Sequence, residues 1–149
     1  MEDQMDNLKK LESLLWQISQ QINLHTKHFL ANNGLTMARF IALAKMDTDK
    51  PITMGELNRR TSLAPGTLTG HIDSLVESGL VKRWRDESDR RAVYLAPTAK
   101  GQELLKQIFA FRVSLLEEAL ADHQDLDLTS LNCDLVDIRH YMQVIPIEH

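Results

Sequence analysis

Hydrophobic residues recur with helical spacing through most of the chain. In residues 5–31 the apolar positions follow one another at intervals of three and four, which is typical of one face of an α-helix: Leu8, Leu11, Leu15, Ile18 and Ile22. Similar spacing predicts helices over residues 37–46, 98–121 and 129–144. Two short alternating runs, residues 80–85 and 92–96, predict a β-hairpin. The expected fold is mainly α with a small β-wing.

The middle of the chain predicts two short helices joined by a turn. Thr53 and Glu56 fit a capping box that opens the first helix. Residues 61–64 are expected to form the turn, and Pro65 suits the first position of the second helix, where its missing N–H has no cost. Gly79 is placed to end that helix in a left-handed conformation.

The second of these helices has one apolar face and one polar face. Its apolar residues share a stripe that we expect to be buried: Leu68, Ile72 and Leu75. Other residues of the helix are free to contact something else: Thr67, Thr69, Gly70, His71 and Ser74. A helix-turn-helix followed by a hairpin is a winged helix-turn-helix, whose second helix enters a DNA major groove. We expect residues 36–97 to form this DNA-binding part of a single domain that spans residues 1–149.

The charge distribution supports a DNA partner although the net charge is −4. Residues 82–91 hold five Lys/Arg against three Asp/Glu, so the hairpin is locally basic. A basic patch on an acidic body can bind phosphate while it avoids general adhesion. The predicted hairpin tip carries two arginines, Arg90 and Arg91. Side chains at a hairpin tip do not contribute to a hydrophobic core, and arginines there suit insertion into a narrow minor groove.

The run from residue 68 to residue 101 resembles the multiple-antibiotic-resistance-regulator (MarR) family of bacterial transcription factors. The residues in step with the family pattern are Asp73, Leu75, Gly79, Arg83, Asp86, Asp89, Arg90, Arg91, Thr98 and Gly101, with Leu35, Thr36 and Phe40 upstream. The resemblance implies a sequence-specific DNA-binding regulator, most simply a repressor. It also implies that Arg91 enters the groove and that Asp89 orients it. The expected DNA-binding residues are Ser62, Pro65, Thr67, Thr69, Gly70, His71, Ser74, Lys82, Arg83, Arg85, Asp89, Arg90 and Arg91.

The sequence departs from the family pattern at three places. Ala64 stands where the family often has a serine cap, which gives up roughly 1 kcal/mol unless Thr61 or Ser62 compensates. Gly70 replaces what is often a long polar residue that contacts DNA, and Pro97 replaces an aliphatic residue. Base reading at position 70 is therefore in question.

The terminal helices carry more apolar surface than a winged domain of this size needs. We therefore expect a homodimer whose dimerisation helices are residues 5–31 and 98–145. The family resemblance further implies a small aromatic or anionic effector, bound where these helices meet the winged part. Its candidate lining residues are Trp16, His25, Phe29, Met37, Arg39, Phe40 and Phe111, although several of these are equally consistent with an ordinary core.

Other functions receive less support from the sequence. The main alternative is a winged-helix module that regulates a protein partner without reading DNA. His25 and His28 are spaced for one metal ion but lack further ligands nearby, and Cys133 is expected to be a small core residue rather than a redox sensor. Neither a phosphate loop nor a nucleophile elbow occurs, so we expect no enzyme and no cofactor. With no apolar leader and no long apolar segment, we expect a cytoplasmic protein without membrane contact.

Overall fold

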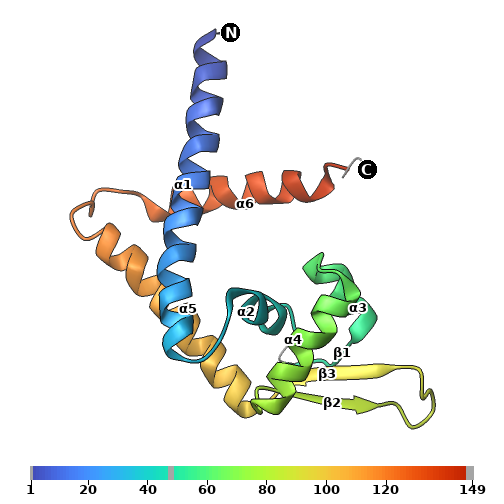
Figure 1. The fold of residues 1–149 in the computed structure, drawn as a ribbon. Helices are drawn as coiled ribbons and strands as arrows, with labels where there is room; N and C mark the ends of the chain where they lie inside the picture. The colour runs from blue at the N-terminus through green and yellow to red at the C-terminus, as the bar shows by residue number, and fades with distance from the viewer. Residues whose placement is uncertain (1, 47–48, 147–149) are drawn as a thin grey trace. The chain divides into compact units, whose positions relative to one another are not determined.

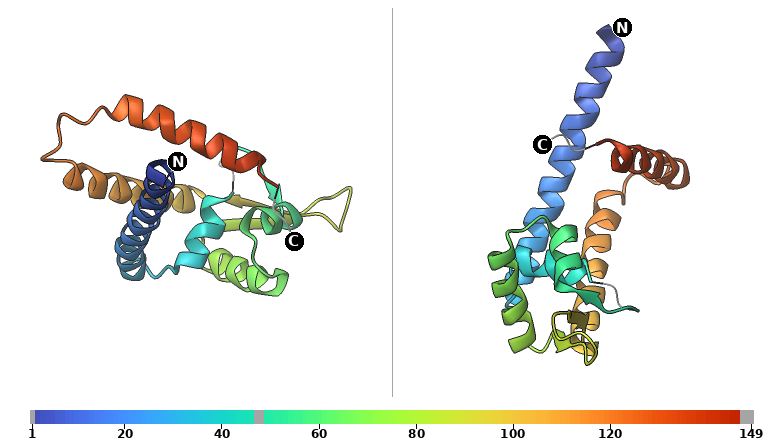
Figure 2. Two further views of the ribbon diagram at one scale, coloured as in Figure 1. Left: turned by 90° about the horizontal axis from the view of Figure 1, so that it is seen from above. Right: turned by 90° about the vertical axis from the view of Figure 1, so that its right-hand side faces the viewer.

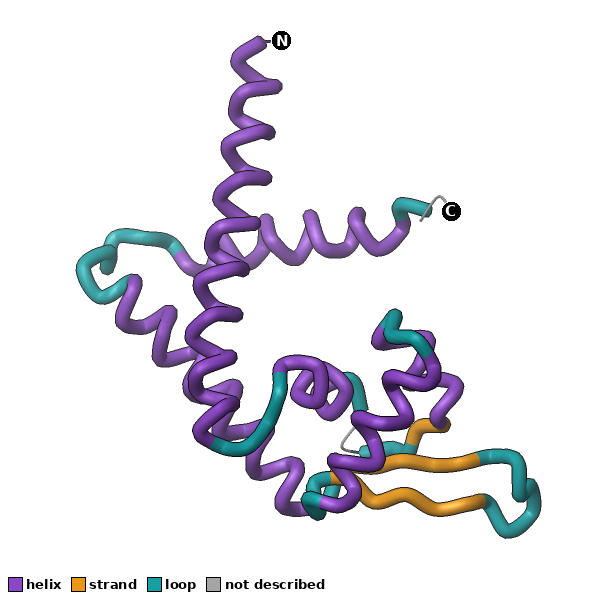
Figure 3. Tube along the Cα trace, in the orientation of Figure 1, coloured by secondary structure: helices purple, strands orange, loops and turns teal. Residues whose placement is uncertain are grey.

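The computed structural model describes residues 2–46 and 49–146. Helices dominate it (Figure 3), and the elements run in the order α1 Glu2–Asn32, α2 Met37–Ala44, β1 Ile52–Thr53, α3 Met54–Thr61, α4 Pro65–Glu77, β2 Val81–Arg85, β3 Val93–Pro97, α5 Ala99–Ala119 and α6 Leu128–Val144 (Figure 1). This confirms the mainly helical fold with a small wing. The chain divides into two compact units, Met1–Leu115 and Leu116–His149.

The wing is part of a three-stranded antiparallel sheet of order β1-β3-β2. In the β2–β3 hairpin Arg83 lies opposite Leu95 and Trp84 lies opposite Tyr94. The short strand β1 adds to the other side of β3, where Ile52 pairs with Leu95. Figure 2 shows the hairpin projecting beyond the rest of this sheet. The predicted strands are confirmed, each shifted by about one residue.

The core of the first unit lies beneath the helix-turn-helix. The stripe predicted for α4 is buried, with Leu68, Ile72 and Leu75 at 1%, 0% and 0% exposure. It packs with buried residues of the neighbouring elements, among them Leu30, Phe40, Leu43, Leu57, Leu80, Leu95, Leu105 and Ile108. The 3.6-residue period of α4 therefore fixes which of its faces remains free.

Two glycines end helices in the way that the sequence predicts. Gly79 has φ +71°, and the Leu80 N–H donates to the Leu75 carbonyl at 2.9 Å. Gly34 has φ +67°, and the Leu35 N–H donates in the same way to Leu30 at 3.0 Å. A residue with positive φ lets the chain turn back and satisfy carbonyls at the helix end. The exit of α4 into the wing is therefore fixed by Gly79.

The turn between α3 and α4 differs from the prediction. Thr61 is the last residue of α3, and Ser62 adopts a left-handed conformation with φ 54°.

The predicted capping box at the start of α3 forms only in part. The side chain of Thr53 caps α3 by accepting from the Glu56 N–H, as expected, but the Glu56 carboxylate binds Arg60 instead of returning to the cap. Only half of the predicted capping box forms, because the cation one turn ahead takes the carboxylate.

The junction between the wing and α5 explains a threonine–glycine pair in the sequence. The Thr98 hydroxyl donates to the Gly79 carbonyl at 2.6 Å and accepts from the Gly101 N–H at 3.1 Å. A Cβ on Gly101 would overlap the carbonyl oxygen of Leu80. Gly101 therefore allows α5 to begin directly against the backbone that follows the recognition helix.

The terminal helices bury far less of their apolar surface. Helix α1 begins at residue 2 rather than residue 5, and its apolar stripe stays open over the first five turns: Leu8, Leu11, Leu15 and Ile18 are 40–55% exposed. In the second unit, Asp127 caps α6, and no residue of that helix is buried. Cys133 is exposed on it, so its assignment as a small core residue is wrong for the single chain.

Candidate nucleic-acid interface

The outward face of α4 is centred on two glycines. At about 100° per residue, Gly66 and Gly70 lie opposite the buried stripe of Leu68, Ile72 and Leu75. A Cβ built on either glycine would meet no heavy atom within 4 Å apart from the backbone of its own helix and the adjacent residues. The backbone of the helix is therefore uncovered on the side that faces away from the core.

The hydroxyl groups on α4 are largely engaged within the helix. Thr69 donates to the Pro65 carbonyl at 3.0 Å, and Ser74 donates to the Gly70 carbonyl at 3.1 Å. Thr67 is exposed and His71 is half-buried. The predicted readers Thr69 and Ser74 thus offer a methyl group or acceptor lone pairs more readily than hydroxyl protons.

The start of α4 has no side-chain cap. Ala64 occupies the N-cap position, with Pro65 at the first helical position. Neither neighbour compensates as the sequence suggested: Ser62 lies in the left-handed turn, and the Thr61 hydroxyl donates back to Leu57 at 3.0 Å. Free N–H groups at this end of α4 can donate hydrogen bonds to an anion such as a DNA phosphate.

An ion pair joins the recognition helix to the wing. The Arg83 guanidinium donates to the Asp73 carboxylate at 2.6 Å, between β2 and α4. Both side chains are exposed, so the pair adds little to stability. The pair links the wing to α4, so the Arg83 guanidinium is engaged with Asp73 in the free chain. Since successive side chains of a strand alternate, Arg85 lies on the same face as Arg83.

The wing tip is closed by carboxylates that accept backbone N–H groups. Asp86 accepts from the N–H and the hydroxyl of Ser88, both at 2.9 Å, and these bonds lower the pKa of Asp86 below its ordinary value. Asp89 accepts from the Arg91 N–H at 3.0 Å. The expected contact between the Asp89 carboxylate and the Arg91 guanidinium is absent from the described residues. Asp89 therefore shapes the turn that presents Arg90 and Arg91, both of which are exposed.

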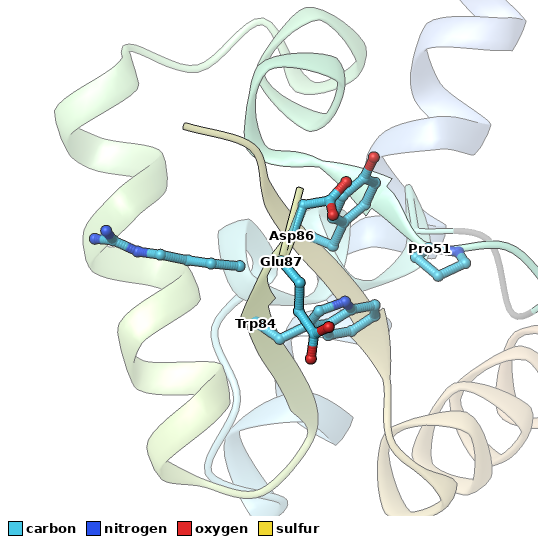
Figure 4. A pocket seen from close by; sticks show the side chains of 6 residues that line it. Pro51, Trp84, Asp86 and Glu87 are labelled. Carbon is cyan, nitrogen blue, oxygen red and sulfur yellow. The ribbon is translucent and has the colours of Figure 1, made fainter. Parts of the chain in front are cut away.

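The other face of the hairpin carries aromatic residues that the sequence analysis did not single out. Trp84 and Tyr94 stack across the strands with ring centroids 6.0 Å apart, and the Lys82 ammonium lies 5.7 Å from the Trp84 ring. They border an open cleft of about 600 Å³ that Arg85, Asp86 and Glu87 also line (Figure 4). The two carboxylates disfavour phosphate in this cleft, so the side of Arg83 is the better DNA-facing side of the wing. Lys82 stands apart from the other predicted cations.

The candidate effector residues differ in burial, and several of them belong to the core of the first unit. Phe29 stacks on Phe111 with centroids 4.5 Å apart, and Phe40, which is buried, packs edge-on against Phe109 at 6.0 Å. Met37 is partly buried against the core. The Nε of Arg39 is buried, with no hydrogen-bond partner among the described residues.

Trp16 and His25 are both exposed in the single chain. Trp16 is 62% exposed and lies about 20 Å along α1 from Phe29, at 1.5 Å per residue. Sequence reasoning missed a polar pair next to Phe29 and Phe111 along the chain: buried Thr26 accepts from the Arg112 guanidinium at 2.9 Å.

Two further features bear on the other functions considered. Within residues 2–46 and 49–146, no three His, Cys, Asp or Glu side chains come together in a way that could hold a metal ion. Over the same residues, every helix is too short or too polar to cross a membrane.

The fold and this surface define a winged helix-turn-helix DNA-binding protein. Residues 35–93 match the model of the MarR family. YsmB, an HTH-type transcriptional regulator of Bacillus subtilis (strain 168), is 24% identical over 93% of this chain and 95% of its own length. YetL, an HTH-type transcriptional repressor of the same organism, is 27% identical over 74% of this chain and 68% of its own length.

Solved structures agree with these relatives. A MarR family protein from Bacillus stearothermophilus superimposes with a TM-score of 0.81 and 26% identity, over 92% of this chain and 96% of that one. The chain is similar to MarR family proteins over its winged helix-turn-helix and in its fold, and it is a DNA-binding transcriptional regulator. Members of this family are not enzymes, which agrees with the expectation from the sequence, and the alternative of a protein-interaction module is not favoured.

Proposed function

We propose that the chain acts as a homodimeric repressor that binds a roughly palindromic operator and is released by a small aromatic or anionic molecule. The observation that carries the DNA-binding part is the joint placement of α4 and the basic wing, tied by the Asp73–Arg83 ion pair at 2.6 Å. A helix with a free outward face and an arginine-tipped hairpin beside it suit adjacent major and minor grooves. The repressor assignment is supported by the name of the relative YetL.

Exposed apolar surface on the terminal helices supports the dimer. In the single chain, large apolar side chains of α1, α5 and α6 are exposed to water: Leu8, Leu15, Ile18, Val113, Leu116, Leu131, Leu135 and Met142. Exposed apolar stripes on each of these helices are the kind of surface that marks a protein interface. A two-fold dimer would present two copies of α4 to successive major grooves about 34–36 Å apart, hence the palindrome.

In this proposal the candidate residues divide into three roles. Arg90 and Arg91 enter the minor groove, and Arg85 contacts phosphate beside it. The N-terminal end of α4, with Ser62 and Pro65, approaches the DNA backbone through its free N–H groups. The outward face of α4 lies against base edges: Thr67, Thr69, Gly70, His71 and Ser74.

The operator is the direct test of this function. Duplexes bound by the full chain would be selected from random DNA, and the recovered sequence would be searched for in the source genome. We expect a palindrome with half-sites about one helical turn apart. Recovery of no preferred sequence, with binding that depends only on duplex length, would refute sequence-specific regulation.

The effector is proposed at the cluster around Phe29, Phe111 and Arg39. Its apolar walls are the stacked rings, and the buried Nε of Arg39 is a donor without a partner among the described residues. A carboxylate or phenolate would satisfy that donor, because burying an unpaired polar group costs free energy. If such a ligand weakens DNA binding, DNA must weaken ligand binding by the same factor.

Salicylate-like and phenolic compounds titrated into the protein–operator complex at fixed salt would test this site. We expect reciprocal coupling of about 5- to 100-fold that is lost in Arg39→Ala and retained in the control Arg59→Ala, an exposed arginine on α3. Binding of these compounds with no effect on DNA affinity would show that the site is not the switch.

A further inference from the structure

The N-terminal half of α4 presents backbone rather than side chains to its surroundings. Gly66 and Gly70 occupy the centre of its outward face, and a Cβ on either would meet no heavy atom within 4 Å beyond the helix's own backbone and the adjacent residues. The N-terminal residues of a recognition helix are those that contact base edges. At the centre of the face that would read DNA, the residues of α4 therefore have only hydrogen atoms in place of side chains.

The helix also lacks the side chains that recognise bases through paired hydrogen bonds. Its sequence, PGTLTGHIDSLVE, contains no Arg, Lys, Asn or Gln. Those residues make the bidentate contacts to guanine and adenine. The hydroxyl protons of Thr69 and Ser74 are committed to backbone carbonyls, and Asp73 is paired with Arg83. His71 is half-buried and can add at most a single bond to a base.

The groups that remain on this face are mainly apolar. In the N-terminal half of α4 they are the methylene groups of the two glycines, the methyl groups of Thr67 and Thr69, and one hydroxyl, that of Thr67. The thymine C5-methyl is the apolar group that a base pair presents in the major groove. Glycine allows the backbone to come close enough to exclude water from such a methyl group.

We propose that α4 reads its half-site through thymine methyl groups, packed against the backbone at Gly66 and Gly70 and against the methyl groups of Thr67 and Thr69. This rests on the DNA-binding function proposed above and specifies the chemistry of the operator: thymines in the major groove beneath the N-terminal half of α4. Hydrogen bonds to purine N7 atoms contribute little to the choice of sequence.

The experiment uses the full chain and the duplex recovered by selection. Each half-site thymine is replaced by deoxyuridine, which removes only the C5-methyl, and binding is measured by fluorescence anisotropy at fixed salt. We expect a loss of about fourfold for each contacted methyl group and about fifteenfold when the symmetric pair is replaced. Deoxyuridine in the flanks serves as the control for altered duplex flexibility, and 7-deazapurines in the half-site should change affinity less than about twofold.

The outcomes separate this proposal from the function on which it rests. Tight, sequence-specific binding that ignores deoxyuridine but is lost with 7-deazapurines would overturn methyl reading and leave the regulator intact. Absence of any sequence-specific binding would overturn both.

A protein variant tests the same contact from the other side. Gly70→Leu places a side chain in open space, so the fold should be retained and thermal stability should not fall, because leucine favours helix more than glycine does. Affinity for the selected duplex should drop at least about tenfold, since the backbone can no longer approach the thymines. Gly55→Leu on α3, also exposed, is the matched control and should bind as the parent does. Full affinity in Gly70→Leu would contradict the close approach.

Discussion

The winged part and the terminal helices are built on the same periodic pattern, yet they bury it differently. In α4, Leu68, Ile72 and Leu75 are at most 1% exposed. In α1, Leu8, Leu11, Leu15 and Ile18 recur at the same spacing and are 40–55% exposed. In α6 the pattern recurs again, and no residue is buried.

This difference separates the part of the molecule that one chain folds by itself from the part whose apolar surface needs a partner. In the winged part, the apolar core is buried within one chain, and hydrogen bonds within that chain close the ends of helices and the wing turn. The terminal helices have an apolar stripe without a partner in the described chain, and an exposed stripe of this length lowers solubility unless it is covered. On the proposed function, a second copy covers it and sets the spacing of the two recognition helices.

Placing a charge on the open stripe of α1 should have the largest effect. Leu15→Glu leaves the core unchanged, because Leu15 is 42% exposed in the single chain. In a two-fold interface the carboxylate would be buried twice, so dimerisation should weaken by about 3–5 kcal/mol. Sedimentation velocity over a range of protein concentrations would measure it.

Gln20→Glu is the matched control for that substitution. Residue 20 lies on the opposite side of α1 from Leu15, at about 100° per residue, and is exposed. It adds the same charge and should leave dimerisation within about 0.5 kcal/mol of the parent. Equal dissociation by both variants would mean that net charge, not the stripe, controls assembly.

A substitution in the winged part should act on folding instead. In Gly101→Ala the new methyl group overlaps the Leu80 carbonyl, and the junction of α4, wing and α5 must shift. We expect a loss of about 2–3 kcal/mol in the free energy of unfolding, measured by urea denaturation. Gly55→Ala, where the nearest atom is 4.0 Å away, should cost nothing or stabilise slightly. A loss in Gly101→Ala no greater than in this control would show that the close approach is not needed.

The wing should give the smallest effect of the three and leave both folding and assembly intact. Arg91→Ala removes one exposed guanidinium per subunit from the tip. Operator affinity should fall by about 1–3 kcal/mol with a shallower dependence on salt, because fewer counterions are released. Lys10→Ala, an exposed cation on α1, should change neither quantity. A salt slope in Arg91→Ala identical to that of the parent would remove Arg91 from the interface.

Local features of the fold could be predicted because short segments determine them. The stripe of α4, Pro65 at its first position and the left-handed Gly79 all follow from neighbouring residues, and the structure confirms each of them. A strand of one or two residues at Ile52 is also expected from the sequence, and it forms beside β3 as the two-residue strand β1.

Features that depend on distant residues were missed or misassigned. The Asp73–Arg83 pair spans ten positions, and the Thr26–Arg112 bond spans 86. Asp89 was expected to hold the Arg91 guanidinium, but the tight tip brings its carboxylate to the backbone N–H instead. Periodicity shows that a helix has an apolar face; it does not show whether the same chain covers it, which is why Cys133 was misplaced.

The central claim is that two copies of the chain bind one palindromic duplex. Native mass spectrometry of the full chain with the selected palindrome, and with a duplex that carries one half-site, would test it directly. We predict two chains on the palindrome, with no stable complex of one chain on either duplex. A single chain bound to one half-site with undiminished affinity would contradict the claim and would assign the open stripes of α1 and α6 to some other partner.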